Sequence, residues 1–217
     1  MTRVRVHNFS VSLDGFGTGE PQTLEAPFGH AGSRLHSWFF PTHTFTGMDS
    51  SRQDPGGSSG VDDAFASNWA SGVGVEIMGR NKFGPQRGPW ADDKWKGWWG
   101  EDPPFRTPVY VLTHFPRPSI EMQGGTTFHF IDASPARALE VARGAASGRD
   151  VRIGGGPSTV RQFLDADLID HMHVVIVPVV LGRGVRLWDG LDGLEERFDV
   201  ESASSPSGVT HLTLNRR

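Results

Sequence analysis

The sequence predicts one α/β domain with a central mixed, largely parallel sheet, and three observations lead to this expectation. Between residues 127 and 165, short apolar segments alternate with segments of helical character, and such alternation implies crossover connections between parallel strands. Residues 174–181 are continuously apolar, which is typical of a strand covered on both faces. The length of 217 residues suits a single domain with insertions, so we expect one domain over residues 1–217.

The N-terminal part is expected to hold one strand and a long irregular segment. Polar and apolar residues alternate over residues 4–11, which predicts a strand ending at the turn-forming pair Asp14-Gly15. Since this start has no apolar signal-peptide region, we expect a cytoplasmic protein. Residues 17–60 are rich in Gly, Pro, Ser and Thr, as in a lid, a binding loop or a disordered insertion. Their aromatic residues argue against pure disorder, because rings need a surface to cover.

The later elements follow from periodicity and from turn residues. A helix is predicted over residues 61–72 and another over 135–146, where Ser134 is the N-cap and proline takes the first position. A third helix is predicted over residues 157–165. Pro178 should interrupt the apolar strand 174–181, since proline cannot donate to a ladder. The remaining predicted strands are 75–78, 108–112, 127–131 and 151–153, with a closing hairpin formed by 198–201 and 209–214.

Composition excludes several classes of protein. The net charge of −4 and the lack of a basic run argue against nucleic-acid binding. No apolar run approaches the ~18 residues that span a bilayer, so we expect no membrane partner. The absence of cysteine removes thiol catalysis and cysteine zinc sites. His171 and His173 could share one face of a strand, but no third ligand is spaced nearby, so we expect no metal.

The most informative stretch is Val151-Arg-Ile-Gly-Gly-Gly-Pro-Ser-Thr159, an apolar strand followed by three glycines and a helix opened by proline. Glycines let backbone amides approach a ligand, and the helix start offers unpaired N–H groups, so the stretch suits a pyrophosphate. Two better-known phosphate motifs do not fit this stretch. A dinucleotide fingerprint would need glycine at position 159, where the chain has Thr159, and a P-loop would need Gly-Lys-Ser/Thr. A purely structural strand-to-helix turn remains the alternative, because such turns are common.

Further segments occur in a characteristic order. They are Ser10-Val-Ser-Leu-Asp-Gly-Phe16, Ile77-Met-Gly-Arg-Asn-Lys-Phe83, Val109-Tyr-Val-Leu-Thr-His114, Phe163-Leu-Asp-Ala-Asp-Leu-Ile-Asp170 and Val177-Pro-Val-Val-Leu-Gly-Arg-Gly184. Together with the triple glycine, this set resembles the dihydrofolate-reductase-like superfamily, in the branch of the riboflavin-biosynthesis reductase domain. The resemblance implies a three-layer sandwich, with insertions at about residues 17–60 and 84–106.

The resemblance also implies an NADPH site. In the family, the segment matching Gly79, Arg80 and Asn81 lies along the cofactor phosphates, and the one matching Leu112, Thr113 and His114 surrounds the adenosine. Arg80 or His114 would be available to a 2′-phosphate, which favours NADPH over NADH. Lys82 stands where the family often has threonine, so that contact is in doubt. The other residues expected at the cofactor are Ser12, Leu13, Gly15, Phe16, Ile153, Gly154, Gly155, Gly156, Ser158 and Thr159.

Acidic residues offer candidates for catalysis, each with a structural alternative. The resemblance places the segment around Asp14 beside the nicotinamide, which makes Asp14 a candidate catalytic acid. As a residue preceding Gly15, it is equally suited to forming a turn. Asp62 and Asp63 stand near the place where dihydrofolate reductases carry an acid for the pterin, but at a helix start they suit the helix dipole.

The substrate side is expected to be aromatic. Trp38, Trp90 and Trp98 lie in the two insertions and could stack on a planar substrate, although a self-packed excursion is the alternative. We expect a reductase that transfers hydride to a C=N or C=O carbon of a small heteroaromatic substrate, similar to 5-amino-6-(5-phosphoribosylamino)uracil reductase or dihydrofolate reductase. A nucleotide-binding protein without turnover is the alternative. Related reductase domains imply a homodimer.

Overall fold

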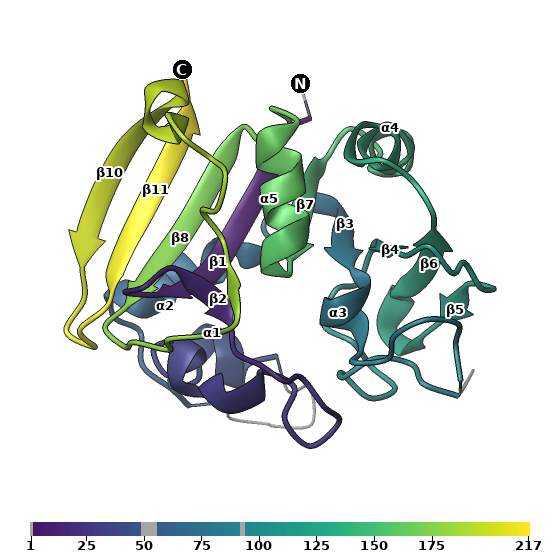
Figure 1. The fold of residues 1–217 in the computed structure, drawn as a ribbon, viewed down its shortest axis with the longest axis horizontal. Helices are drawn as coiled ribbons and strands as arrows, with labels where there is room; N and C mark the ends of the chain where they lie inside the picture. The colour runs from purple at the N-terminus through teal and green to yellow at the C-terminus, as the bar shows by residue number, and fades with distance from the viewer. Residues whose placement is uncertain (1, 49–55, 92–93) are drawn as a thin grey trace.

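The computed structural model describes residues 2–48, 56–91 and 94–217, and its centre is a nine-stranded sheet (Figure 1). The strand order is β10-β11-β8-β1-β7-β3-β4-β6-β5. The six strands from β8 to β6 in this order are parallel, and the outer strands β10, β11 and β5 pair antiparallel. The strands are β1 (Val4–Ser12), β3 (Val73–Gly79), β4 (Pro108–Leu112), β5 (Ile120–Glu121), β6 (Thr127–Ile131), β7 (Asp150–Gly155), β8 (His171–Val177), β10 (Phe198–Ser204) and β11 (Thr210–Arg216). The predicted mixed, largely parallel sheet is confirmed.

One face of the sheet is covered by α4 (Pro135–Ala145) and α5 (Pro157–Asp165). Both helices begin with proline, and the Ser134 side chain accepts a hydrogen bond from the Arg137 backbone amide, as expected of an N-cap. Their apolar residues pack against alternate residues of the central strands, in a core that contains Leu139, Phe163, Val75, Ile77, Val151 and Ile153. The main hydrophobic core therefore lies between these two helices and the sheet.

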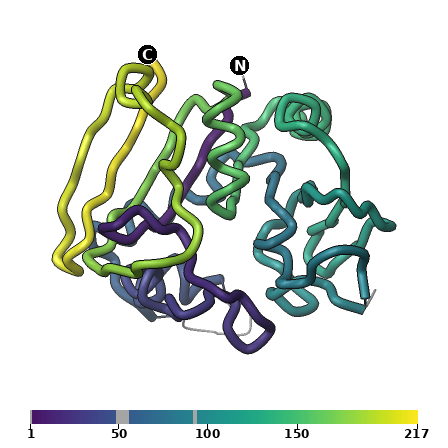
Figure 2. The backbone as a smooth tube through the Cα atoms, viewed as in Figure 1, coloured from purple at the N-terminus to yellow at the C-terminus, as the bar shows by residue number. Residues whose placement is uncertain are grey.

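The opposite face is covered by the two insertions, which gives the third layer. Over β8, residues of the first insertion form a cluster around Leu35 and Trp38. Over β3, β4 and β6, the second insertion packs Trp95, Trp99 and Phe105 against the sheet. In Figure 2 both insertions lie at the end of the molecule away from the two chain termini. The central strands between the two covers are left with an open face.

The first insertion contains more structure than the sequence predicted. It holds β2 (Phe16–Thr18), which pairs with β9 (Val185–Arg186), two 3₁₀ helices (Gly29–Ala31 and Arg34–His36) and α1 (His43–Thr46). Its buried Leu35 and Trp38 explain this order, because they anchor the segment to the sheet. Part of the segment, residues 49–55, lies outside the described residues.

Other boundaries differ by a few residues. The helix predicted over 61–72 is α2 (Val61–Ala66) followed by a 3₁₀ turn, and α3 (Arg80–Phe83) was not predicted. The strand predicted over 174–181 begins at His171 and ends at Val177, because Pro178 ends the ladder. Within the described ranges, no helix has the length and apolarity that crossing a bilayer requires.

Candidate active site

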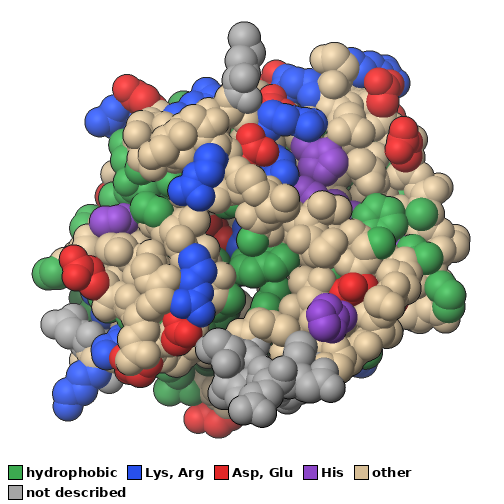
Figure 3. Space-filling view, turned by 180° about the vertical axis from the view of Figure 1, so that it is seen from behind, with side chains coloured by type: hydrophobic (Ala, Val, Ile, Leu, Met, Phe, Trp, Pro, Cys, Tyr) green, Lys and Arg blue, Asp and Glu red, His purple; other side chains and the backbone are tan. Residues whose placement is uncertain are grey.

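A cavity of about 1440 Å³ opens over β1, β7 and β3, between the two insertions. Figure 3 shows the molecule from behind, hollowed near its centre with hydrophobic side chains around the opening. Sites for a single small ligand occupy roughly 300–1000 Å³. The cavity therefore has room for two ligands side by side, such as a dinucleotide and a substrate.

The triple glycine forms part of the cavity wall, where β7 ends and α5 begins. Gly154 and Gly156 line the cavity, as do Ser158 and Thr159 from the first turn of α5. A Cβ atom added at Gly156 would meet no atom within 4 Å, so the backbone here faces open space. Since the first amides of a helix have no intrahelical acceptor, this wall offers N–H donors to an anion.

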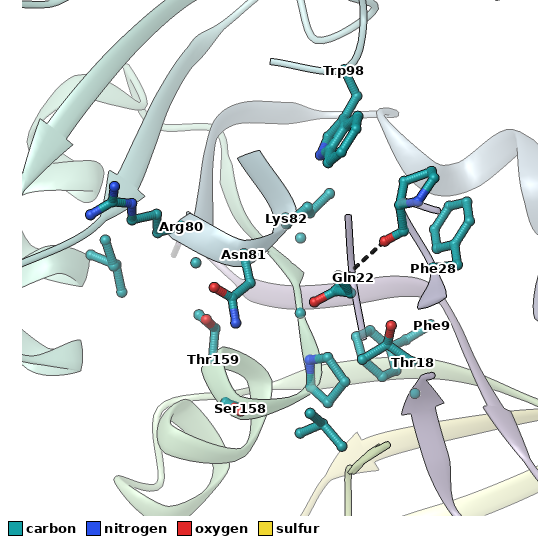
Figure 4. Close-up of a pocket in the computed structure, with 18 of the residues that line it drawn as sticks. Phe9, Thr18, Gln22, Phe28, Arg80, Asn81, Lys82, Trp98, Ser158 and Thr159 are labelled. Carbon is teal, nitrogen blue, oxygen red and sulfur yellow. Dashed lines mark hydrogen bonds between the residues drawn. The ribbon is translucent and has the colours of Figure 1, made fainter. Parts of the chain in front are cut away.

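A second glycine brings β3 close to this wall. A Cβ atom at Gly79 would lie 2.2 Å from the Thr159 side-chain oxygen, so only glycine allows the end of β3 to approach α5 so closely. The chain then enters α3, and Arg80, Asn81 and Lys82 all line the cavity. Figure 4 shows Arg80 and Asn81 on the same side of the cavity as Ser158 and Thr159, and Lys82 next to Asn81.

Only part of the Arg80 guanidinium is engaged in contacts with the described residues. Its Nη1 donates to the Gly88 carbonyl oxygen (2.5 Å), and the group lies 3.8 Å from the centre of the Trp90 ring. Nε and Nη2 are buried and have no hydrogen-bond partner among the residues that the structure describes. Burial, together with neighbouring Arg87, lowers the pKa of Arg80, although a guanidinium stays charged at neutral pH. A half-buried cation at a cavity wall, with two donors that have no partner among the described residues, is suited to bind a phosphate.

The end of β4 adds the remaining residues predicted for the adenosine side. Leu112, Thr113 and His114 all line the cavity, and Nδ1 of His114 lies 3.0 Å from a carboxylate oxygen of Asp132. These residues follow the strand next to β3, so they extend the wall that contains Arg80.

The turn after β1 is placed differently from expectation. The Asp14 carboxylate accepts hydrogen bonds from the Ser12 hydroxyl (2.6 Å) and from the amides of Leu181 (3.1 Å) and Gly182 (2.7 Å). These bonds, the Ser12 one first, lower the pKa of Asp14 to about 2, so it is ionised at neutral pH. Asp14 does not line the cavity and therefore has the turn-forming role instead of that of a proton donor.

The neighbours of Asp14 do not line the cavity either. Leu13 is exposed to solvent, Phe16 is buried in the core beside β8, and the Ser12 hydroxyl accepts a bond from the Phe16 amide. The segment reaches the cavity one residue later, through Gly17 and Thr18. In the glycine turn, Ile153 belongs to the main core and Gly155 packs toward the Phe9 ring.

The three predicted substrate tryptophans have different positions. Trp98 lines the cavity (Figure 4). Trp38 is only 2% exposed, and its Nε1 donates to the Ser10 hydroxyl (2.8 Å), so it is a core residue behind the wall. Trp90 supports the Arg80 guanidinium and does not line the cavity. The structure thus brings one of the three to the predicted place.

The side of the cavity away from the glycine turn is nevertheless aromatic. The rings come from both insertions and from the segment between α2 and β3; they are Phe28, His36, Phe39, Phe40, Phe45, Trp69, Trp98, Trp99 and Phe105. This composition suits a flat, apolar ring system.

A buried ion cluster lies between the two sides and was missed by the sequence analysis. Glu76 on β3 is 1% exposed and pairs with Arg152, its register partner on β7, and with Lys82 (2.8 Å). Arg152 and Lys82 line the cavity. The available signal was a charged residue inside each of two otherwise apolar strands, which in such positions requires a partner.

The remaining polar candidates are engaged elsewhere. Asp62 accepts a hydrogen bond from His211 Nε2 (2.9 Å), and Asp63 from the Thr44 amide (2.7 Å). His173 contacts His211, and His171 contacts Asn215. In the part of the chain that the structure describes, no three potential ligands are grouped as a metal site would require.

The fold is that of the dihydrofolate-reductase-like proteins, and its cavity is bordered by the glycine turn and the first turn of α5. Residues 5–210 match the model of the RibD C-terminal domain, and the chain belongs to this family. No curated protein sequence shows significant similarity to the chain. Family and fold together support a reductase of the riboflavin-pathway and dihydrofolate-reductase-like type.

Solved structures agree with this fold. A protein from Shewanella sp. PV-4 assigned to riboflavin biosynthesis is 21% identical, with a TM-score of 0.59 and coverage of 100% of this chain and 99% of its own. The deaminase/5-amino-6-(5-phosphoribosylamino)uracil reductase of Thermotoga maritima is 12% identical, with a TM-score of 0.54; the match covers all of this chain but 57% of that one. Dihydrofolate reductase from Enterococcus faecalis, complexed with NADP(H), is 10% identical, with a TM-score of 0.53 and coverage of 100% and 96%.

Proposed function

We propose that the protein is an NADPH-dependent reductase that transfers hydride to a C=N or C=O carbon of a small heteroaromatic substrate. The observation that carries this proposal is the wall formed by Gly156, the first turn of α5 and the unpaired donors of Arg80. This wall is built for phosphate, and it adjoins an aromatic compartment large enough for a second ligand.

The residues present fit the cofactor. The backbone at Gly156, with the hydroxyls of Ser158 and Thr159, would hold the pyrophosphate, and Leu112 and Thr113 would border the adenosine. Arg80 is the cation that would pair with a 2′-phosphate, which favours NADPH over NADH. When bound, the cofactor supplies the hydride, and the protein supplies distance, orientation and a dry environment.

The aromatic compartment supports the proposed class of substrate. Rings such as Phe28, Phe105 and Trp98 offer flat surfaces for stacking and exclude water from the transfer. We therefore favour a substrate whose reducible bond belongs to a planar ring, over a highly charged phosphosugar precursor.

The test is a nucleotide titration of the purified chain, followed by the change in nucleotide fluorescence. We expect NADPH to bind more tightly than NADH, and to raise the melting temperature as RT ln(1 + [L]/Kd) requires. Absence of binding for both nucleotides at millimolar concentration would refute the proposal. Tight binding with hydride transfer to none of a panel of cyclic imines and ketones would instead favour nucleotide binding without turnover.

A further inference from the structure

Lys82 extends into the cavity from α3 and contacts a buried carboxylate. Its Nζ lies 2.8 Å from Oε1 of Glu76, and its side chain retains 28% of its exposure at the cavity that it lines. In Figure 4 Lys82 lies between Asn81, on the phosphate-binding side, and Trp98, on the aromatic side. The ammonium group is therefore located where a cofactor and a substrate would meet.

The carboxylate of Glu76 serves two cations. Arg152 is 5% exposed, donates to the second oxygen of Glu76 and to the Trp69 carbonyl oxygen (2.9 Å), and stacks on the Trp69 ring. One negative and two positive charges leave an excess positive charge in a buried site, which is costly. Since a guanidinium does not release its proton, Lys82 is the member of the cluster that can restore neutrality by doing so.

A glycine of the triple-glycine turn makes this arrangement possible. A Cβ atom at Gly154 would lie 2.0 Å from Oε1 of Glu76 and 2.6 Å from Nζ of Lys82. Any side chain at this position would displace the ion pair. The lysine thus packs directly on the turn proposed to hold the cofactor, without an intervening side chain.

We propose that Lys82 is the catalytic acid of this reductase, an inference that rests on the proposed function. When bound, the reduced nicotinamide would supply the hydride, two electrons and one proton, for the new C–H bond and would be left oxidised by two electrons. The electron pair of the C=N or C=O bond moves to the heteroatom, and this atom takes a proton from the Lys82 ammonium. The lysine is left as a neutral amine beside Glu76 and recovers its proton from water.

The protonation chemistry of the site agrees with this role. Burial lowers the pKa of Lys82 to about 7, so the group is an effective acid near neutral pH. The charged groups around it are Glu76 from β3 and Arg152 from β7, and the titratable ring nearby is His36 from the 3₁₀ helix Arg34–His36. Burial, with a contribution from Lys82 itself, lowers the pKa of His36 to about 4, so this ring is neutral and leaves Lys82 as the donor.

The deciding experiment is a ¹³C NMR titration of protein labelled at lysine Cε. The chain has three lysines, at positions 82, 94 and 96, and Lys82→Met assigns the signal of interest. We expect Lys82 to titrate near pH 7. Saturating NADPH should shift the Lys82 signal and leave the other two in place. An ordinary titration of Lys82, or a signal that bound NADPH does not move, would overturn the proposal.

Nucleotide fluorescence, recorded on the same samples, separates two kinds of failure. Absence of NADPH binding would overturn the proposed function together with this inference. Binding of NADPH by a protein whose Lys82 titrates near pH 10 would overturn the role of Lys82 alone.

Kinetics with dihydrofolate as a probe substrate distinguish proton donation from simple charge pairing. Lys82→Met should lower kcat at least about a hundredfold, and Lys82→Arg should not restore it, because a guanidinium keeps the charge but does not give up its proton. The wild-type rate should fall as pH rises through about 7. Lys96→Met, at an exposed lysine paired with Glu101, is the matched control and should leave kcat unchanged. Full activity of Lys82→Arg would refute the role; if the probe is not turned over, the titration decides.

Discussion

The two sides of the cavity are constructed in different ways. The proposed phosphate side is mostly backbone: two glycines, Gly79 and Gly156, and the first turn of α5 form it, and the half-buried Arg80 adds charge. Where this side meets the aromatic side, the cavity wall is made of side chains, namely the carboxylate of Glu76 and the cations that pair with it, Arg152 and Lys82. A backbone wall tolerates change in the residues around it, whereas a buried ion cluster depends on every member.

The largest effect is expected from breaking the ion cluster. Glu76→Gln would leave the buried Arg152 and the half-buried Lys82 without a carboxylate, and removing one partner of a buried pair costs about 3–5 kcal/mol. Chemical denaturation measures this loss in the free energy of unfolding. Glu101→Gln is the matched control, since Glu101 pairs with Lys96 at the surface and should lose about 0–1 kcal/mol. Equal losses for the two variants would show that the cluster does not carry the stability assigned to it.

A smaller effect, confined to binding, is expected on the backbone side. Gly156→Val places a side chain in the open space before α5 and should weaken NADPH binding about a hundredfold, or about 2.7 kcal/mol. Gly155 is a poorer choice, because its φ of 107° would strain any other residue. Gly144→Val, in α4 and also next to open space, is the control. Titration of both variants with NADPH checks this, and equal affinities would argue against the glycine cradle.

Removing the Arg80 cation should change the selectivity between NADPH and NADH more than it changes the affinity for the part that the two nucleotides share. Arg80→Met keeps the contact with Trp90 but loses the unpaired donors, so we expect the preference for NADPH over NADH to fall about tenfold, or about 1.4 kcal/mol. The ratio of the two dissociation constants is the measurement. A ratio unchanged from the wild type would place the 2′-phosphate elsewhere, with His114 as the next candidate.

The last effect concerns stability and pH. The folded state lowers the pKa of Lys82 from 10.5 to about 7, so between these values the unfolded chain binds a proton that the folded chain does not. Wild-type stability should therefore rise with pH across this window, whereas Lys82→Met lacks this contribution. We expect the melting temperature of Lys82→Met relative to the wild type to be highest at pH 6 and to decrease toward pH 9. Parallel melting curves would mean that the lysine has an ordinary pKa.

The same contrast explains what could be predicted from the sequence. The glycine turn and the ends of β3 and β4 are local motifs, so Gly156, Arg80 and Thr113 could be expected at one cavity. Glu76 and Arg152 lie on different strands and meet only through strand register, which no local pattern specifies, and Lys82 joins them from α3. Trp38 was predicted at the substrate for a related reason. A large ring in an insertion can cover either a ligand or the sheet, and Trp38 is buried in the cluster over β8.

Strand alternation divides the two central strands between separate tasks. Val75, Ile77, Val151 and Ile153 point into the main core, while Glu76, Arg152 and Gly154 face the cavity side. A deep mutational scan of β3 and β7 should therefore alternate in phenotype at every second codon, with loss of abundance at core positions and loss of catalysis at cavity positions. Because α4 and α5 pack on the core-facing residues of these strands, substitutions at the cavity-facing residues leave that packing unchanged. Directed evolution can therefore vary the cavity for new substrates while the core under the helices stays constant.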